Sequence, residues 1–387
     1  MPRPASALRD RVTLFLLSAT VAKLALAAVL GGTSDIQQRF DEARVFLAGG
    51  DVLDPRNTGG PAFFLFGHYA ITVLAFLIAK ATGFPFKFWI KAPAILSDLG
   101  VSFLLRSRFP GNPRTAVAYM LNPITLILSV YHGQQHSVAV LAAVWAVCLS
   151  LGAAPVWAGV ALAVAASVRQ HFAMLIAPLL MHIRQRRVVT CAVFAGILVV
   201  LNLPILMNPH ALRTLAPMSN YGIWGYSIPL RQGPRVLALA GLRTNLFDRV
   251  NDALDAYSSV LYILWGVVFL LWLWRRPHRD VWLQALVFFV GFYAVSPKFG
   301  VQWLIWAVPF WLVADYAGAT IYTVLGTSYL LGSYWVWTFN ARYGVQSITA
   351  NLHVLTAPDL TMYLAVGMLG FLTWLYCVRS AWRLARS

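Results

Sequence analysis

The chain has 387 residues, of which 59% are hydrophobic and 11% charged, and its formal net charge is +17. Apolar runs that approach the roughly 20 residues needed to cross a bilayer core recur along the whole chain, which excludes a soluble protein and indicates an all-α polytopic membrane protein. The excess of Lys and Arg is typical of basic loop ends near anionic lipid, and no nucleic-acid-binding motif accompanies it.

The first apolar run, VTLFLLSATVAKLALAAVLGG, follows Arg3, Arg9 and Arg11. A signal peptide has the same order of features, but this run is long and lacks a small-residue cleavage site. We therefore expect it to be retained as the first membrane span.

Short basic clusters predict the orientation, because Lys and Arg accumulate on the cytoplasmic side of membrane proteins. The clusters are Arg3/Arg9/Arg11, Arg106/Arg108/Arg114, Arg184/Arg186/Arg187, Arg275/Arg276/Arg279 and Arg379/Arg383/Arg386. About twelve spans place all of them on one face. These spans cover residues 12–31, 88–105, 115–131, 136–151, 155–168, 171–183, 189–207, 257–274, 281–295, 302–315, 318–336 and 361–377. Both termini are then cytoplasmic.

The apolar stretch 61–80, PAFFLFGHYAITVLAFLIAK, must not cross in this arrangement. A crossing there would move the cluster around Arg106 to the outside, so we interpret the stretch as a re-entrant or interfacial helix. Several other spans are short, which favours tilted, broken or re-entrant helices. We interpret the chain as one membrane domain, residues 1–387, with extracytoplasmic loops at about 32–87, 208–256 and 337–360.

The first of these loops begins TSDIQQRFDEAR. Asp35 lies just beyond the first span, where a carboxylate can accept a proton from a hydroxyl group near the membrane surface. The alternative is an N-cap for the helix that follows, and the two roles are compatible. We interpret Asp41 and Glu42 as solvated charges on the exposed face of that helix.

The segment KFWIKAPAILSDLG places Lys91 and Asp98 on one helical face, roughly 10 Å apart along the helix axis. That separation is too large for an assured ion pair. Asp98 lies inside an apolar span and must be paired, protonated or hydrated. We assign both residues structural hydrogen-bonding roles within the membrane.

The segment SVYHGQQHSVAV puts His132, Gln134 and His136 between two apolar runs. Polar groups at membrane depth usually face a bundle interior or an aqueous cavity. These three side chains either satisfy helix ends or line a binding site. The spacing of the two histidines, with no acidic ligand nearby, gives little support to a divalent cation, and we expect no certain cofactor.

Two further segments, SVRQHF and SPKFGVQW, contribute Arg169, His171, Lys298 and Gln302 on the same predicted side of the membrane. Converging cations suit a phosphate or pyrophosphate, whereas either cation alone could extend to the membrane surface. Cys148, Cys191 and Cys377 fall in apolar runs without metal-ligand spacing, and we interpret them as small core residues.

Five segments, in this order, resemble the GT-C superfamily of polytopic glycosyltransferases. They are TSDIQQRFDEARVFLAGGD, KAPAILSDLG, MLNPITLILSVYHGQQHSV, ASVRQHFAMLIAPLL and AVSPKFGVQWLIWAVPF. Members of this superfamily use polyprenyl-phosphate sugars and include the dolichol-phosphate-mannose-dependent mannosyltransferases of GPI and N-glycan assembly and their bacterial relatives.

The resemblance implies a GT-C-like bundle and a catalytic aspartate in the first extracytoplasmic loop, at the position of Asp35. Two departures bear on metal dependence and on the acceptor. Gln37 stands where some members carry a second acid, and His136 stands where relatives often carry an aspartate.

The chemistry and the resemblance together predict inverting transfer of mannose or another hexose from a polyprenyl-phosphate donor to a glycan or lipid acceptor. Asp35 is the expected base, Arg169 and Lys298 stabilise the leaving phosphate, and polar side chains orient sugar or phosphate oxygens. The orienting set is His171, His132, Gln134, His136 and Gln302.

The segment SNYGIWGYSIP, residues 219–229, either presents Trp224 and Tyr226 to the acceptor or packs them internally. A lipid-linked sugar transporter or flippase, and a non-catalytic assembly subunit with a degenerate enzyme fold, remain alternative functions. The absence of an Asn-X-Ser/Thr sequon and the Arg- and Ala-rich composition favour a bacterial inner membrane.

Overall fold

The computed structural model describes residues 4–58, 65–152, 154–183, 185–208, 224–241, 246–345 and 351–386, and this described part contains helices and no β-strand. Some parts of the predicted basic clusters and loops lie outside it, namely Arg3, Arg184, 209–223 and 346–350. The chain divides into two compact units. The first comprises Met1–Ala216, Arg276–Ala285 and Val308–Tyr316, and the second comprises Pro217–Arg275, Leu286–Ala307 and Ala317–Ser387. A single domain over residues 1–387 stays a prediction.

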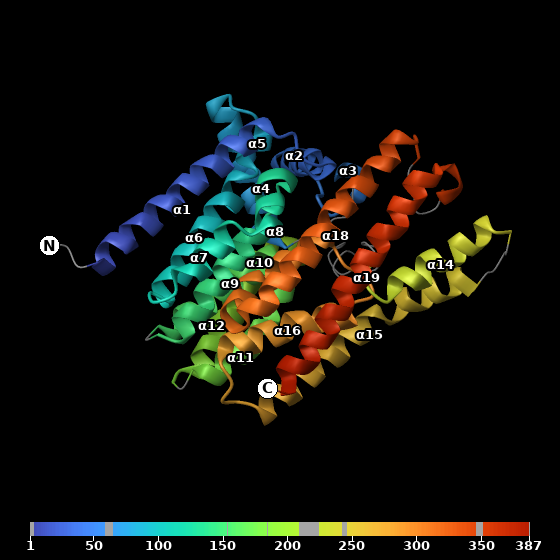
Figure 1. Ribbon diagram of the computed structural model, residues 1–387. Helices are drawn as coiled ribbons and strands as arrows, with labels where there is room; N and C mark the ends of the chain where they lie inside the picture. The colour runs from blue at the N-terminus through green and yellow to red at the C-terminus, as the bar shows by residue number, and fades with distance from the viewer. Residues whose placement is uncertain are drawn as a thin grey trace. The chain divides into compact units, whose positions relative to one another are not determined.

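The first unit contains most of the shorter helices (Figure 1). They are α1 (Pro4–Val29), α2 (Ser34–Leu47), α3 (Pro55–Thr58), α4 (Phe66–Thr82), α5 (Phe86–Trp89), α6 (Ala92–Arg108), α7 (Pro113–Met120), α8 (Pro123–Leu126), the π-helix η1 (Ile127–His132), α9 (His136–Ser150), α10 (Pro155–Val168), the 3-10 helix η2 (Gln170–Leu175), α11 (Ile176–His182), α12 (Arg187–Leu206) and α17 (Val308–Ala314).

The second unit contains three of the longest helices. Its elements are α14 (Ser227–Leu239), α15 (Leu246–Arg275), most of α16 (Val281–Val295), the 3-10 helix η3 (Val301–Ala307), α18 (Tyr316–Arg342), the 3-10 helix η5 (Leu352–Val354) and α19 (Ala357–Arg386). The predicted loop 208–256 is therefore partly helical, because α14 and the start of α15 fall within it.

Five helices in the described part are long and apolar enough to cross a membrane, namely Asp10–Val29, Phe86–Arg108, Arg187–Leu206, Ala256–Arg275 and Ala357–Arg386. Several of the other predicted spans are apolar helices of only 10–17 residues in the structure. At about 1.5 Å per residue such helices reach roughly 15–26 Å, which is less than the roughly 30 Å of a bilayer core. The count of about twelve spans therefore stays a prediction.

Two of the expected spans are broken. Residues 115–131 form α7, α8 and η1 in succession, because Pro123 cannot continue the hydrogen bonding of α7 and the Asn122 side chain accepts a bond from the Ile124 N–H at 3.0 Å instead. Residues 171–183 form η2 and α11. Both breaks agree with the expectation of interrupted helices.

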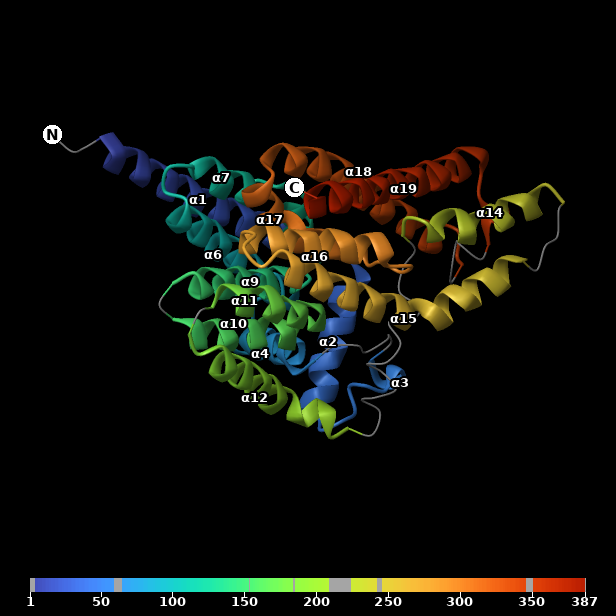
Figure 2. The same cartoon turned by 90° about the horizontal axis from the view of Figure 1, so that it is seen from below.

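In the first unit, α6, α9, α10 and α12 follow one another as a row of neighbouring helices, and α2 lies across the axes of these helices (Figure 2). α2 packs on α4, which packs in turn on α10 and α12. A short helix oriented across a row of apolar helices is suited to a membrane surface, which agrees with the assignment of α2 to a loop region.

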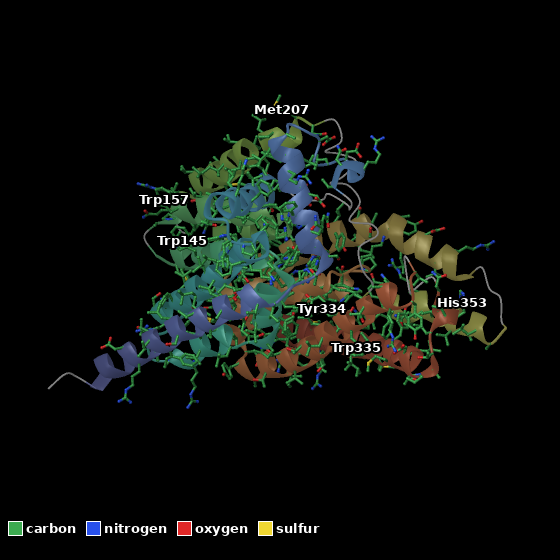
Figure 3. All side chains as sticks on the ribbon, turned by 90° about the horizontal axis from the view of Figure 1, so that it is seen from above. Trp145, Trp157, Met207, Tyr334, Trp335 and His353 are labelled. Atoms are coloured by element: carbon green, nitrogen blue, oxygen red, sulfur yellow. The ribbon has the colours of Figure 1, made fainter. Side chains whose placement is uncertain are left out.

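The outer face of the first unit exposes apolar and aromatic side chains, as expected of a lipid-facing surface. Trp145 of α9 and Trp157 of α10 project outward and are 49% and 63% exposed (Figure 3). Tryptophans of this kind are enriched at membrane interfaces. Cys191 is also exposed, on α12, so the prediction of a core position is wrong for that cysteine, whereas Cys377 is buried and Cys148 half-buried.

Candidate active site

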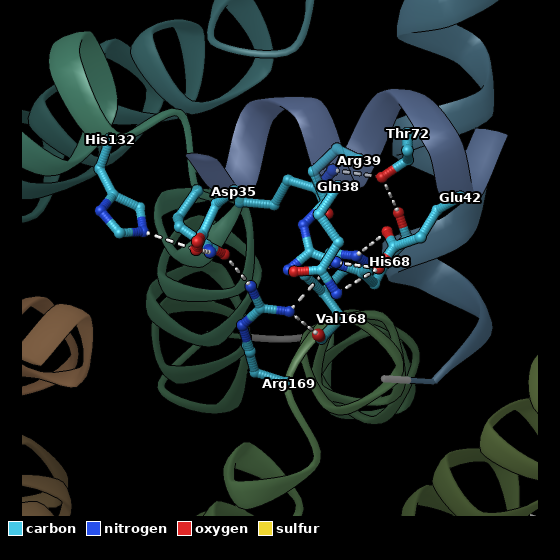
Figure 4. Close-up of polar contacts among 11 residues, drawn as sticks. Asp35, Gln38, Arg39, Glu42, His68, Thr72, His132, Val168 and Arg169 are labelled. Carbon is cyan, nitrogen blue, oxygen red and sulfur yellow. Dashed lines mark hydrogen bonds and ion pairs between the residues drawn. The ribbon is translucent and has the colours of Figure 1, made fainter. Parts of the chain in front are cut away.

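Four segments of the first unit meet around Asp35: the start of α2, the turn after η1, the start of α4 and the end of α10 (Figure 4). They bring together five of the residues that the sequence analysis selected. These residues are Asp35, His132, Gln134, His136 and Arg169. All five belong to the first unit.

Asp35 lies in the first turn of α2, whose N-cap residue is Thr33. The interpretation of Asp35 as a side-chain cap is therefore wrong, because its carboxylate contacts other side chains. His132 Nε2 lies 3.1 Å from Asp35 Oδ2, and the Gln134 amide donates to the same oxygen. Within the described residues no hydrogen bond reaches the other oxygen, Oδ1, and the side chain is 28% exposed.

The charge state of Asp35 follows from these neighbours. Burial by itself raises the pKa of the Asp35 carboxyl, but the hydrogen bond and charge of His132, the Arg39 guanidinium and the Gln134 amide outweigh it and hold the pKa well below its usual range. Asp35 is therefore ionised at every physiological pH. The helix N-terminus favours the same charge state.

The turn after η1 aims His132 and Gln134 at the same carboxylate oxygen. η1 ends at Gly133, whose φ of +75° lies in the left-handed region that favours glycine, and the Gly133 N–H donates to Leu128 O at 3.2 Å. α9 begins at His136 directly after the turn. The polar segment HGQQH thus marks a helix break, and two of its side chains, His132 and Gln134, contact Asp35.

Arg169 follows the last residue of α10 in an extended conformation and is 3% exposed. Its Nε donates to His136 Nδ1 at 3.2 Å, and its Nη2 donates to Gln134 Oε1 at 2.8 Å. Its Nη1 donates to His68 Nδ1 at 3.2 Å and to Val168 O at 2.9 Å. One guanidinium therefore organises side chains from three other segments.

The sequence analysis missed part of the site. Glu42, expected to be a solvated charge, is fully buried and pairs with Arg39, which is 4% exposed. The other Glu42 oxygen, Oε2, lies 3.2 Å from His68 Nε2. Asp35, Arg39 and Glu42 recur at helical spacing, and that spacing was the available signal that the face is buried. By contrast, Asp41 is only half-buried, and it accepts a hydrogen bond from the exposed Gln37 one turn earlier on the same face of α2.

The Glu42 carboxylate has the same balance of electrostatic effects as the Asp35 carboxylate. Burial raises the pKa of Glu42, but the charge of Arg39 and the hydrogen bond and charge of His68 outweigh it and lower the pKa below its usual value. Asp35 and Glu42 both raise the pKa of Arg39 against the opposing effect of its burial. The three residues thus form an ionised set on one face of α2.

α4 is fixed where it carries His68. The Phe66 N–H donates to Asn202 Oδ1 at 2.8 Å and the Gly67 N–H donates to Ser167 Oγ at 2.9 Å, so the first two N–H groups of the open helix end have partners. A Cβ atom at Gly67 would lie 2.7 Å from Ser167 Oγ, so only glycine permits this approach of α4 to α10.

Three further residues were predicted to bind the donor. His171 is half-buried in η2, close enough to His136 to interact electrostatically. Lys298 and Gln302 are buried in the second unit, where Tyr262 and Ser296 hydroxyls donate to Lys298 O. Their role toward a donor phosphate stays a prediction.

Lys91 and Asp98 have separate partners, as their spacing indicated. Asp98 forms a buried ion pair with Lys23 of α1 at 2.9 Å, and the Tyr119 hydroxyl donates to its Oδ1 at 3.5 Å. Lys91 Nζ donates to Leu30 O at 2.8 Å, just past the end of α1. These contacts join the α1 region to the α6 region, and Lys23 is the partner that sequence reasoning missed. The structural roles of Lys91 and Asp98 stay a prediction.

Trp224 packs within the second unit. It is fully buried, its Nε1 donates to Tyr293 O at 2.7 Å, and its ring stacks on Phe299 with centroids 4.0 Å apart. The Tyr226 hydroxyl donates to Val295 O at 2.8 Å. Internal packing, the alternative kept open for these aromatics, is what the structure contains.

In the described part of the chain, no group of three or more His, Cys, Asp or Glu side chains is arranged to hold a metal ion, which is compatible with the expectation of no certain cofactor. No protein-family model matches the chain, and no functionally characterised protein matches it in sequence. The resemblance to the GT-C superfamily stays a prediction that rests on the quoted segments.

Proposed function

We propose that the chain is an integral-membrane inverting glycosyltransferase with Asp35 as its general base. The substrate pair is a polyprenyl-phosphate hexose, such as a mannose donor, and an extracytoplasmic glycan or lipid acceptor. The observation that carries the proposal is the asymmetry of the Asp35 carboxylate. Two donors hold its Oδ2, while Oδ1 receives no hydrogen bond from the described residues and the side chain is partly exposed.

In the proposed reaction the acceptor hydroxyl donates a hydrogen bond to Asp35 Oδ1 and its oxygen attacks the anomeric carbon. The bond from that carbon to the phosphate oxygen breaks, and the phosphate leaves with the electron pair while the hydroxyl proton passes to Asp35. A carboxylate with a lowered pKa is a weak base. Proton transfer is therefore late, when bonding to the sugar has already made the hydroxyl acidic.

The leaving phosphate needs positive charge more than it needs a strong acid. Arg169 is the candidate cation of the first unit and Lys298 that of the second, with His171 and Gln302 as further donors. Four of the five N–H groups of Arg169 already donate to His136, His68, Val168 and Gln134, so its contribution to the phosphate would come mainly from its positive charge.

The wider arrangement belongs to the same proposal. It consists of a GT-C-like bundle of about twelve transmembrane helices with both termini cytoplasmic, in a bacterial inner membrane. The apolar helices that are too short to cross alone would then be re-entrant or joined into interrupted spans. Interrupted helices are tolerated in membranes where they line a cavity.

The test is to incubate the purified protein with a panel of polyprenyl-phosphate sugars and to measure release of the polyprenyl phosphate. Asp35→Asn keeps the shape of the side chain but cannot accept the proton, so turnover should fall roughly a hundredfold to ten-thousandfold while donor binding persists. Asp41→Asn is the matched control, because it removes a carboxylate from the exposed face of the same helix.

The outcomes separate the candidate functions. Wild-type turnover that survives Asp35→Asn would remove Asp35 as the base. Donor binding without release of the lipid phosphate by the wild-type protein, together with movement of the donor across a vesicle membrane, would replace the enzyme with a lipid-linked sugar transporter. Binding without either activity would favour a non-catalytic subunit.

A further inference from the structure

A continuous line of hydrogen bonds joins the buried carboxylate of Glu42 to the carboxylate of Asp35 (Figure 4). Glu42 Oε2 lies 3.2 Å from His68 Nε2, and His68 Nδ1 lies 3.2 Å from Arg169 Nη1. Arg169 Nη2 then donates to Gln134 Oε1 at 2.8 Å, and the Gln134 amide donates to Asp35 Oδ2. The other four residues of this line are each at most 3% exposed.

The chemistry of the fixed groups determines the direction of every bond in this line. A carboxylate only accepts and a guanidinium only donates. His68 stands between Glu42 and Arg169, so its Nδ1 accepts from Arg169 and its proton lies on Nε2, facing Glu42. Gln134 stands between Arg169 and Asp35, so its oxygen faces Arg169 and its N–H faces Asp35.

We infer that Glu42 is a positioning residue of the Asp35 site, which acts through His68, Arg169 and Gln134. The inference rests on the proposed function for its catalytic consequence, although the hydrogen-bond line itself does not. Glu42 selects the His68 tautomer whose Nδ1 can accept from Arg169. With that acceptor in place, Arg169 holds the oxygen of Gln134 and leaves its N–H for Asp35.

Loss of Glu42 weakens the preference for this tautomer, because Arg169 is then the one partner in this line that favours it. A proton on His68 Nδ1 would face the Arg169 guanidinium, donor against donor, and the guanidinium would have to turn away. Gln134 would then lose one of the two partners that orient its amide, and its hydrogen bond to the Asp35 carboxylate would be held less firmly. Glu42 therefore affects the base without touching it, whereas a residue that merely balances the charge of Arg39 would not.

A thiol at position 35 measures this effect without any enzymatic activity. In a background in which Cys148, Cys191 and Cys377 are replaced by alanine, Asp35→Cys provides a thiolate that can accept from His132 and Gln134. The pH dependence of its alkylation by iodoacetamide in detergent gives the thiol pKa. Glu42→Gln should raise that pKa by about one unit, since the loss of one oriented donor to an anion is worth roughly 1.4 kcal/mol.

The sign of the shift is diagnostic. Removing the negative charge of Glu42 acts through space to stabilise the thiolate and would lower the thiol pKa. Loss of the Gln134 donor raises it. A thiol pKa that falls or stays constant in Glu42→Gln would overturn the inference. Asp41→Asn, the neighbouring carboxylate on the exposed face of α2, removes a charge without touching the line and should give no rise.

His68→Gln tests the same line without changing the formal charge, and it leaves Glu42 in place as the partner of Arg39. It therefore provides a test of the inference even if Glu42→Gln does not fold. The glutamine amide reaches the position of His68 Nε2 and can donate to Glu42, but it offers no acceptor at the position of Nδ1. The thiol pKa should rise as it does in Glu42→Gln. An unchanged value in a folded His68→Gln protein would contradict the inference.

Turnover gives the second readout. Glu42→Gln should lower kcat about tenfold, as expected when an anion loses one oriented hydrogen bond, and should leave the donor KM within about twofold. In an Asp35→Asn background it should cause no further loss, because both changes act on one step. Equal losses in both backgrounds would indicate a general effect on the fold and would contradict positioning.

The two readouts keep this inference separate from the proposed function. A wild-type protein that transfers no sugar from any polyprenyl-phosphate donor would sink the proposed function, while the predicted rise of the thiol pKa would still establish the coupling of Glu42 to position 35. An active wild-type protein whose thiol pKa is unmoved by both Glu42→Gln and His68→Gln would sink the coupling alone.

Discussion

The two oxygens of the Asp35 carboxylate have different surroundings, and this difference separates orientation from reactivity. His132 and Gln134 both address Oδ2. Donors on one oxygen fix the plane of the carboxylate and keep it ionised, but they also make it a weaker base. The site therefore favours a base that is always deprotonated and always in place over one whose pKa is near the working pH.

This charge state predicts how stability responds to acid. Because the folded-state pKa of Asp35 is lowered, its ionised contacts stabilise the fold above the unfolded-state pKa of roughly 3.9 and lose that effect only as the pH falls toward the folded-state value. The difference in thermal midpoint between the wild-type protein and Asp35→Asn should be constant from pH 8 to about pH 5 and should shrink below about pH 4. Thermal unfolding in detergent at a series of pH values measures it, and a difference that grows as the pH falls from 7 to 5 would mean that the folded-state pKa is raised.

Single residues differed in how well the sequence predicted them. The sequence analysis selected five residues of the site because polar groups next to apolar runs are energetically costly and are usually functional. They are Asp35, His132, Gln134, His136 and Arg169. Glu42 was misassigned for a physical reason: its helical spacing to Asp35 and Arg39 indicates a shared helix face, but the local sequence cannot identify a buried partner from another helix. Only the packing of α4 against α2 reveals that partner, His68.

At the level of elements, the site is built from helix ends rather than helix middles. η1 stops at Gly133, α10 stops before Arg169, and α2 and α4 both begin within the site. A side chain in the middle of a helix points away from the helix axis into one neighbour, whereas residues at a break can turn toward a shared centre. The sequence predicted interrupted helices in general, but proline and glycine positions alone did not predict which breaks would face one another.

The turn at Gly133 is the element most exposed to a single substitution. Gly133→Ala forces a non-glycine residue to keep a φ of +75°, at a cost of roughly 1–2 kcal/mol, and its Cβ would lie 3.2 Å from side-chain atoms of Ile36 and Lys91. The strain falls between His132 and Gln134. We expect a lower thermal midpoint and, in the proposed reaction, a lower kcat.

Gly83→Ala is the matched control for this prediction. Gly83 ends α4 with a φ of +68°, and no atom lies within 4 Å of a Cβ built there. The backbone cost should be similar, but turnover per folded molecule should not change. Equal kcat values for the two variants would show that the Gly133 turn does not position the site.

For the molecule as a whole, the all-helical class was predictable because apolar runs of this length and frequency have few other solutions. The number of crossings was not, because hydropathy cannot distinguish a short apolar helix that spans at a tilt from one that is buried among others. Buried charges show the same limit. Asp98 needed a partner in any arrangement, but only the packing of α1 on α6 identifies it as Lys23.

The predicted topology can be tested at positions that the structure shows to be accessible. The Arg56 side chain is 86% exposed, and His353 is also exposed (Figure 3). Both residues lie in loop regions that we expect to be extracytoplasmic. Arg108 and Arg187 are exposed and belong to clusters that we expect to be cytoplasmic. Single cysteines at the four positions, in the background without native cysteines, can be probed in intact bacterial cells with a membrane-impermeant maleimide.

Arg56→Cys and His353→Cys should react before the inner membrane is permeabilised, and Arg108→Cys and Arg187→Cys only afterwards. Labelling after permeabilisation is the control for reactivity at each position. The decisive pair is Arg56→Cys and Arg108→Cys, because α4 and the span Phe86–Arg108 both lie between them. If α4 does not cross, one crossing separates the two positions and they label from opposite sides. If both label from outside, α4 is itself a transmembrane helix, and every basic cluster after it must be reassigned.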